Sequence, residues 1–251
     1  MAEFSSELDG KLSALDFLKT LRACDSQIFS GWRNHSSVFD EEILHSCEFV
    51  SSYCAKLIAS ALADPNKKMA IVMTGCGTSG RIAFQTARRY NCILAAAGIR
   101  PLFHYLISGG DSALLLSDEL PEDDPVVGAS DLSSLIQEFG EDGTFLIGVT
   151  CGLSAPYVAG QLHYALEDLT GTVGAAVMGF NPIVLARNAV IEKANGKWTF
   201  RDIAQRLEVA SQRAPADERR FAILNPVVGP EPIAGVPTYI DPFPLPRHYF
   251  F

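Results

Sequence analysis

The chain has 251 residues and a formal net charge of -9, and hydrophobic residues make up 48% of it. This composition fits a packed core rather than disorder, and the length suffices for one large α/β domain. The acidic balance disfavours nucleic acid as a partner, because phosphates and an acidic surface repel each other. No apolar stretch is long enough to cross a bilayer, so no membrane partner is expected.

The cysteines and the N-terminus bear on location. None of the six cysteines forms a Cys-x-x-Cys pair, so neither a zinc site nor a redox motif is indicated, and we expect no cofactor. The polar N-terminus carries no secretory signal. We therefore expect an intracellular protein, in the cytoplasm, with the nucleus as an alternative location.

Along the chain, two segments with helical spacing come first, at 12–29 and 43–62. From Met69 onward, short apolar segments alternate with helical ones. The expected strands are 69–73, 104–107, 144–149, 173–178 and 221–224, and the expected helices are 81–97, 127–138, 156–169 and 200–213. This alternation predicts an α/β fold: a three-layer sandwich with a parallel sheet of about five strands, preceded by N-terminal helices.

The loop after the first expected strand reads Gly75-Cys76-Gly77-Thr78-Ser79-Gly80-Arg81. Glycines let the backbone approach a ligand, and the helix that follows offers unpaired N–H groups to an anion. The pattern indicates a phosphate cradle. It lacks the lysine of a nucleotide P-loop, which favours a small sugar phosphate over a triphosphate. The glycines also fit Gly-x-Gly-x-x-Gly, so a dinucleotide site stays a minor alternative.

An acidic run, 118–124, separates the second expected strand from its helix. Its first interpretation is a solvated loop whose acids favour the start of the next helix. Because the run also follows a strand end, it can overhang the same site. Glu119 and Glu122 are its candidates for a functional role.

A second loop of the same kind, Thr150-Cys151-Gly152-Leu153-Ser154-Ala155-Pro156, follows the strand 144–149. Open α/β sheets bind ligands at the carboxyl ends of their strands, so the two loops predict one site. Turns with a Ser or Thr helix cap are the structural alternative for each loop. The candidate ligand-binding residues are Gly75, Gly77, Thr78, Ser79, Glu119, Thr150, Cys151, Gly152 and Ser154.

Several stretches, in the same order, resemble one family. The first loop resembles the first signature of SIS (sugar isomerase) domains, within the branch shared by glucokinase regulatory protein and N-acetylmuramic acid 6-phosphate etherase. Residues 105–111 are similar to the second strand of that branch. The stretches that favour the regulatory protein are Gly152–Gln161, Gly179–Pro182 with Ala186–Asn188, and Leu224–Pro226 with Gly229–Glu231.

The resemblance implies three segments: an N-terminal helical segment (1–66), a SIS phosphosugar-binding domain (67–231) and a proline-rich tail (232–251) that departs from the family. It implies that Thr78, Ser79 and Ser154 contact the phosphate or the sugar. The implied ligand is fructose 6-phosphate or fructose 1-phosphate, and the implied partner is glucokinase. The chain resembles roughly the first half of such a protein, as expected of a fragment, a splice product or a truncated gene model.

These observations predict a phosphosugar-binding regulatory domain rather than an enzyme. The alternative is a phosphosugar lyase of the etherase type, or an isomerase, with Glu119 or Glu122 as the acid/base residue. Etherase chemistry is disfavoured because Arg89 stands where the etherase carries an acidic residue.

Overall fold

The computed structural model describes residues 13–26, 28–31, 35–115, 123–191, 197–215 and 218–228. The strands are β1 (Met69–Gly75), β2 (Phe103–Ile107), β3 (Gly143–Val149), β4 (Val173–Met178) and β5 (Phe221–Leu224). The α-helices are α2 (Ala14–Asp25), α3 (Glu41–Ala63), α4 (Gly77–Ala96), α5 (Pro125–Leu135), α6 (Pro156–Leu166) and α7 (Phe200–Arg213). Shorter helical turns are η1 (Gly110–Leu114), η3 (Ile136–Gly140) and η4 (Ile183–Leu185).

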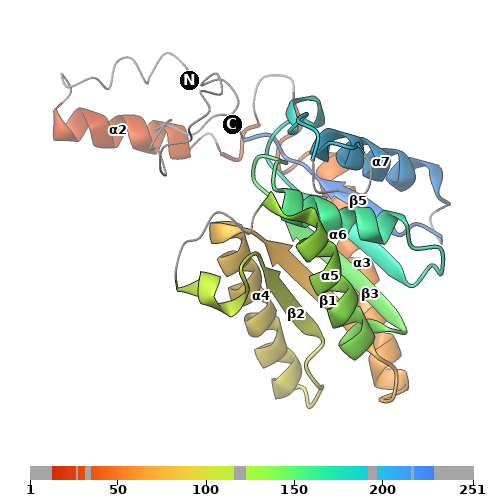
Figure 1. The fold of residues 1–251 in the computed structure, drawn as a ribbon. Helices are drawn as coiled ribbons and strands as arrows, with labels where there is room; N and C mark the ends of the chain where they lie inside the picture. The colour runs from red at the N-terminus through yellow and green to blue at the C-terminus, as the bar shows by residue number, and fades with distance from the viewer. Residues whose placement is uncertain are drawn as a thin grey trace.

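The five strands form one parallel sheet in the order β2-β1-β3-β4-β5. Helices α5, α6 and α7 cover one face, and α3 and α4 cover the other (Figure 1). Alternate residues of each strand enter the two cores: Val72 faces α5 and α6, whereas Ile71 faces α3 and α4. Because helices cover both faces of the sheet, the strands are mostly apolar along their length rather than alternating between apolar and polar residues.

The predicted three-layer α/β sandwich is therefore confirmed, and each predicted strand is present. Several boundaries differ by a few residues, and the one that matters for the site is the start of α4. This helix begins at Gly77, not at Arg81, because Thr78, Ser79 and Gly80 coil into its first turn. The proline-rich tail (232–251) lies outside the described residues. Leu57 of α3, which belongs to the expected N-terminal segment, is part of the core on one face of the sheet. No helix among the described residues is long and apolar enough to cross a membrane.

Helices α5 and α6 approach each other unusually closely, at two glycines. A Cβ atom added to Gly160 would lie 1.9 Å from the carbonyl oxygen of Pro125, and one added to Gly128 would lie 2.1 Å from that of Tyr157. Both neighbours are backbone atoms, so the two helices would have to separate to admit a side chain. The close packing fixes the start of α6, and with it the loop that precedes this helix.

Candidate ligand site at the carboxyl edge of the sheet

The two predicted loops emerge next to each other. From β1 the chain crosses to β2 on one side, whereas from β3 it continues to β4 on the other side. At such a reversal, open α/β sheets bind their ligands in a crevice outside the carboxyl ends of the two strands, which are β1 and β3 here. Gly75 and Val149, the last residues of these strands, are paired in register. The structure thus brings Thr78, Ser79 and Ser154 to the same edge of the sheet.

Three glycines shape the loop after β1. A Cβ on Gly75 would lie 2.8 Å from the backbone of Ser79, and one on Gly80 would lie 2.4 Å from Cγ1 of Ile107. These two glycines let α4 start directly against the sheet. Gly77 has a φ of 48°, a conformation that disfavours other residues. The first turn of α4 is consequently exposed at its N-terminus, with Thr78 exposed and Ser79 half-buried.

The helix starts differ in how they are capped. Four α-helices lie between strands in the part of the chain that the structure describes. Asp124 caps α5 and Thr199 caps α7 with their side chains, but the N-cap residues of α4 and α6, Cys76 and Ala155, make no side-chain cap bond. Uncapped N-termini leave amide donors available for an anion. The alternative that Thr78, Ser79 or Ser154 serves as a helix cap is therefore not supported.

A buried leucine holds the loop after β3 in place. Leu153 is fully buried and has a φ of 52°, which is uncommon for a residue other than glycine. Its side chain occupies the space beside Gly179, where an added Cβ would lie 2.4 Å from Cδ2 of Leu153. The hydroxyl of Thr150 accepts a hydrogen bond from the amide of Ser154 at 3.3 Å. This anchoring turns Gly152 and Ser154 outward, and Ser154 is exposed.

Two residues from the segment after β4, Asn181 and Arg187, contact the loop after β3, although no role was predicted for either. The Asn181 amide nitrogen donates to the carbonyl of Gly152 at 3.4 Å. Arg187 donates its backbone N–H to Leu153 O at 3.1 Å, and its Nη1 lies 3.4 Å from Ser154 O. Both residues stand in stretches that carried the family resemblance. Asn181 and Arg187 reach this loop because β3 and β4 are neighbouring strands, so the segments that follow them lie side by side.

On the β2 side, the dinucleotide alternative loses support. The acid after β2, Asp111, accepts a 2.7 Å hydrogen bond from the Tyr105 hydroxyl. Burial and this carboxylate raise the pKa of Tyr105 to about 12, so the hydroxyl keeps its proton and Asp111 stays engaged. The strand order is that of flavodoxin-like folds rather than of the dinucleotide-binding Rossmann fold.

The acidic run is described only in part. Glu119 and Glu122 lie outside the described residues. Asp124 caps α5 by accepting from Val126 N and Val127 N, as the helix-start interpretation predicted. Asp123 forms an ion pair with Arg187, at 3.0 Å between Oδ1 and Nη1.

Arg89 lies far from the crevice. It is exposed on α4, about three turns beyond Gly77, which corresponds to roughly 18 Å along a helix axis. Its charge therefore does not decide the chemistry at the loop, and the sequence argument against etherase chemistry loses this support.

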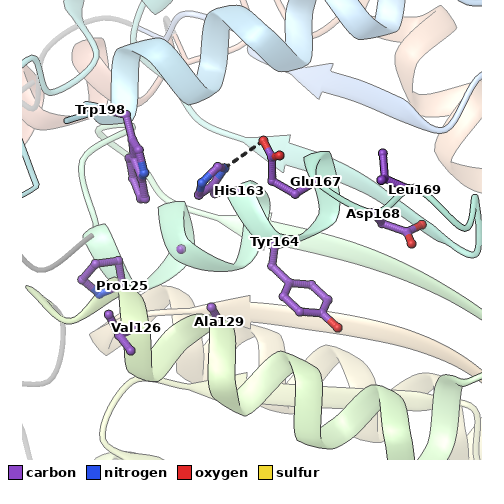
Figure 2. Close-up of a pocket in the computed structure, with 10 residues that line it drawn as sticks. Pro125, Val126, Ala129, His163, Tyr164, Glu167, Asp168, Leu169 and Trp198 are labelled. Atoms are coloured by element: carbon purple, nitrogen blue, oxygen red, sulfur yellow. Dashed lines mark ion pairs between the residues drawn. The ribbon is translucent and has the colours of Figure 1, made fainter. Parts of the chain in front are cut away.

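Two cavities lie elsewhere on the molecule. One, of about 590 Å³, is lined by residues of α5 and α6 and by Trp198 (Figure 2). There His163 pairs with Glu167 and packs edge-on against Trp198, with ring centroids 5.0 Å apart. Burial lowers the pKa of His163. The other cavity, of about 620 Å³, lies between α3, α7 and the end of β5. None of the predicted ligand-binding residues that the structure describes lines either cavity.

Comparison with known proteins shows which family the chain resembles. Residues 53–166 match the family model of the glucokinase regulatory protein N-terminal SIS domain. Glucokinase regulatory protein of Xenopus laevis is 35% identical over 233 residues, which cover 91% of this chain and 35% of that protein. N-acetylmuramic acid 6-phosphate etherase of Staphylococcus epidermidis is 29% identical over 160 residues, 61% of this chain and 50% of the etherase.

Among solved structures, phosphoheptose isomerase of Neisseria gonorrhoeae matches with a TM-score of 0.42 and 13% identity, covering 84% of this chain and 82% of the isomerase. The chain spans about a third of the length of the regulatory proteins that it matches. The predicted resemblance to the N-terminal SIS domain of glucokinase regulatory protein is confirmed by the family match and by the similarity to the regulatory proteins themselves.

Proposed function

We propose that this SIS domain is a noncatalytic sensor that binds a sugar phosphate, fructose 6-phosphate or fructose 1-phosphate, in the crevice between the loops after β1 and β3. One observation carries the proposal above the others. The two helices that start at the crevice are uncapped, whereas α5 and α7 carry side-chain caps. Their free amides and positive dipole ends suit a phosphate group.

The hydroxyl groups of Thr78, Ser79 and Ser154 would complete the phosphate contacts. Neither loop contains a carboxylate or an imidazole, the groups that most often act as a general acid or base. This composition supports binding without catalysis. The lyase or isomerase alternative would depend on Glu119 or Glu122 instead.

The relatives suggest what such binding regulates. Their name, glucokinase regulatory protein, motivates glucokinase as the partner. We propose that occupancy of the crevice changes the affinity for this enzyme, and linkage then requires glucokinase to change the affinity for the sugar phosphate by the same factor. We also propose that the SIS domain spans 67–231, between a helical segment (1–66) and a tail (232–251). The proposed location is the cytoplasm or the nucleus.

Calorimetry and thermal melting of the purified chain test the proposal. We expect fructose 6-phosphate or fructose 1-phosphate to bind and to raise the melting temperature, and free fructose to do neither. Equal stabilisation by fructose and its phosphates would contradict a phosphate site. Release of lactate from N-acetylmuramic acid 6-phosphate, abolished by Glu119→Gln or Glu122→Gln, would instead establish the lyase.

A further inference from the structure

Arg187 lies beside the loop after β3 and contacts it through its guanidinium group. The loop after β3 has no positively charged residue of its own, so Arg187 supplies a positive charge on this side of the crevice. We propose that Arg187 is the residue that neutralises the phosphate of the bound sugar phosphate, and that the negative charge of the neighbouring Asp123 opposes this binding. This inference rests on the proposed function and deepens it by assigning the charge recognition to one side chain.

Arg187 is tied to the loop at two points. Its backbone N–H donates to Leu153 O at 3.1 Å, and its Nη1 lies 3.4 Å from the carbonyl oxygen of Ser154. Its own carbonyl accepts from the amide of Arg201 in the first turn of α7. The guanidinium group is thus held next to the residue whose hydroxyl is predicted to contact the phosphate.

Part of the guanidinium group remains available for a ligand. Both of its side-chain bonds, to Asp123 and to Ser154, use Nη1. Among the described residues, Nε and Nη2 form no further hydrogen bond, and the side chain is 40% exposed. A guanidinium group presents its donors as a planar fork that matches two phosphate oxygens, so Nε and Nη2 together can bind one phosphate group.

A full positive charge is needed here because helix N-termini supply only about half an elementary charge each. A sugar phosphate carries nearly two negative charges at neutral pH. The arginine on the opposite side, Arg81, donates to the carbonyl oxygens of Ala113 and Leu114 and thereby holds η1 beside β2. Arg187 is the corresponding cation on the side of β3 and β4.

The carboxylate of Asp123 provides a second, independent test of the role of Arg187. Its carboxylate lies 3.0 Å from Nη1 and is 65% exposed, so the ion pair contributes little to stability. A phosphate bound at Arg187 would lie near this carboxylate and be repelled by it. Removing the charge of Asp123 should therefore strengthen phosphate binding, whereas a purely structural ion pair predicts unchanged or weaker binding.

The test is calorimetric titration with fructose 6-phosphate and fructose 1-phosphate of the wild-type chain and of Arg187→Gln, Arg187→Lys, Asp123→Asn and Arg201→Gln. Arg201→Gln is the matched control, because this variant also removes one positive charge close to Arg187. In the wild-type chain, Nε of Arg201 donates to the carbonyl oxygen of Ala186, the residue before Arg187. Loss of a charge-assisted bond predicts roughly ten- to hundredfold weaker binding for Arg187→Gln. Arg187→Lys should lose less, Asp123→Asn should bind about two- to fivefold more tightly, and Arg201→Gln should stay within about twofold of wild type.

The outcomes separate the two proposals. Equal losses in Arg187→Gln and Arg201→Gln, or weaker binding by Asp123→Asn, would overturn the role of Arg187 while phosphosugar binding stands. A wild-type chain that binds neither ligand would overturn the proposed function and this inference together. Urea denaturation shows whether each variant is folded. If Arg187→Gln does not fold, the affinities of Arg187→Lys and Asp123→Asn still test the role of Arg187.

Discussion

Replacing Gly179 by alanine should disturb the ligand loop through a single contact. The new Cβ would lie 2.4 Å from Cδ2 and 2.7 Å from Cγ of Leu153, which is fully buried and already in a left-handed conformation. Overpacking of this kind costs about 1–3 kcal/mol of the free energy of unfolding. Because Leu153 anchors the loop that presents Gly152 and Ser154, we expect sugar phosphate affinity to fall as well.

The same contact predicts a rescue. Leu153→Ala alone should cost about 2–5 kcal/mol, because it removes a buried side chain and leaves a cavity. In the double variant the Gly179→Ala methyl group enters space that Leu153→Ala has vacated, so its penalty should largely disappear. The expected coupling is roughly 0.5–3 kcal/mol in favour of the double variant.

Urea denaturation of the four chains measures this coupling, and calorimetry with fructose 6-phosphate measures the effect on binding. Gly171→Ala is a suitable control: its φ of 81° makes alanine strained, but no atom lies within 4 Å of the added Cβ. It should lose stability and keep its ligand affinity. Additive effects of Gly179→Ala and Leu153→Ala, within about 0.5 kcal/mol, would refute the steric reasoning.

Three further predictions concern the site, the helix packing and pH. Ser79→Ala and Ser154→Ala should each weaken sugar phosphate binding by roughly 1.5–3 kcal/mol in calorimetry, and unchanged affinity in both would show that the loops are only turns. Gly160→Ala should lower the free energy of unfolding in urea by about 3 kcal/mol, because its Cβ would meet the Pro125 carbonyl at 1.9 Å; a wild-type midpoint would refute the close approach. Burial, with Arg100 nearby, lowers the pKa of His104. As the pH falls below about 6.5, His104 therefore becomes protonated in the unfolded chain before it does in the folded one. The free energy of unfolding consequently decreases from that pH down to the folded-state pKa. His104→Gln should make the free energy of unfolding less dependent on pH between about pH 7.5 and 5.5, measured by urea denaturation.

Local patterns in the sequence sufficed for the fold and for part of the site. The apolar runs fixed the strands, and the glycines with Thr78 and Ser79 marked the loop after β1. The start of α4 was misplaced because glycine, serine and threonine are poor helix formers, so the helix appeared to begin at Arg81. Here close packing of Gly75 and Gly80 against neighbouring atoms outweighs propensity.

The rest of the site depends on contacts between residues distant in sequence. Nothing in the sequence indicates that Leu153 adopts a positive φ, because the cause is the space beside Gly179, which follows the next strand, β4. Arg187 and Asp123 are also far apart in the chain, and they form an ion pair beside the loop after β3, where Arg187 also contacts Ser154 O. Patterns of adjacent residues cannot show such contacts, whereas the parallel sheet with its strand order does.

The uncapped start of α4 suggests that ligand binding is favoured here over stability. A capping side chain typically stabilises a helix by about 1 kcal/mol, yet position 76 holds a cysteine that makes no side-chain cap bond. Cys76→Asp should therefore raise the free energy of unfolding by roughly 0.5–2 kcal/mol, measured in urea. The same carboxylate would occupy the amides that the phosphate needs and would repel its charge, so sugar phosphate affinity should fall at least about tenfold, the equivalent of 1.4 kcal/mol. Cys76→Ser is the control, because its neutral hydroxyl adds a cap without the charge and should leave binding closer to wild type. If Cys76→Asp stabilises the chain and binds the sugar phosphate as tightly as wild type, the phosphate does not lie at the N-terminus of α4.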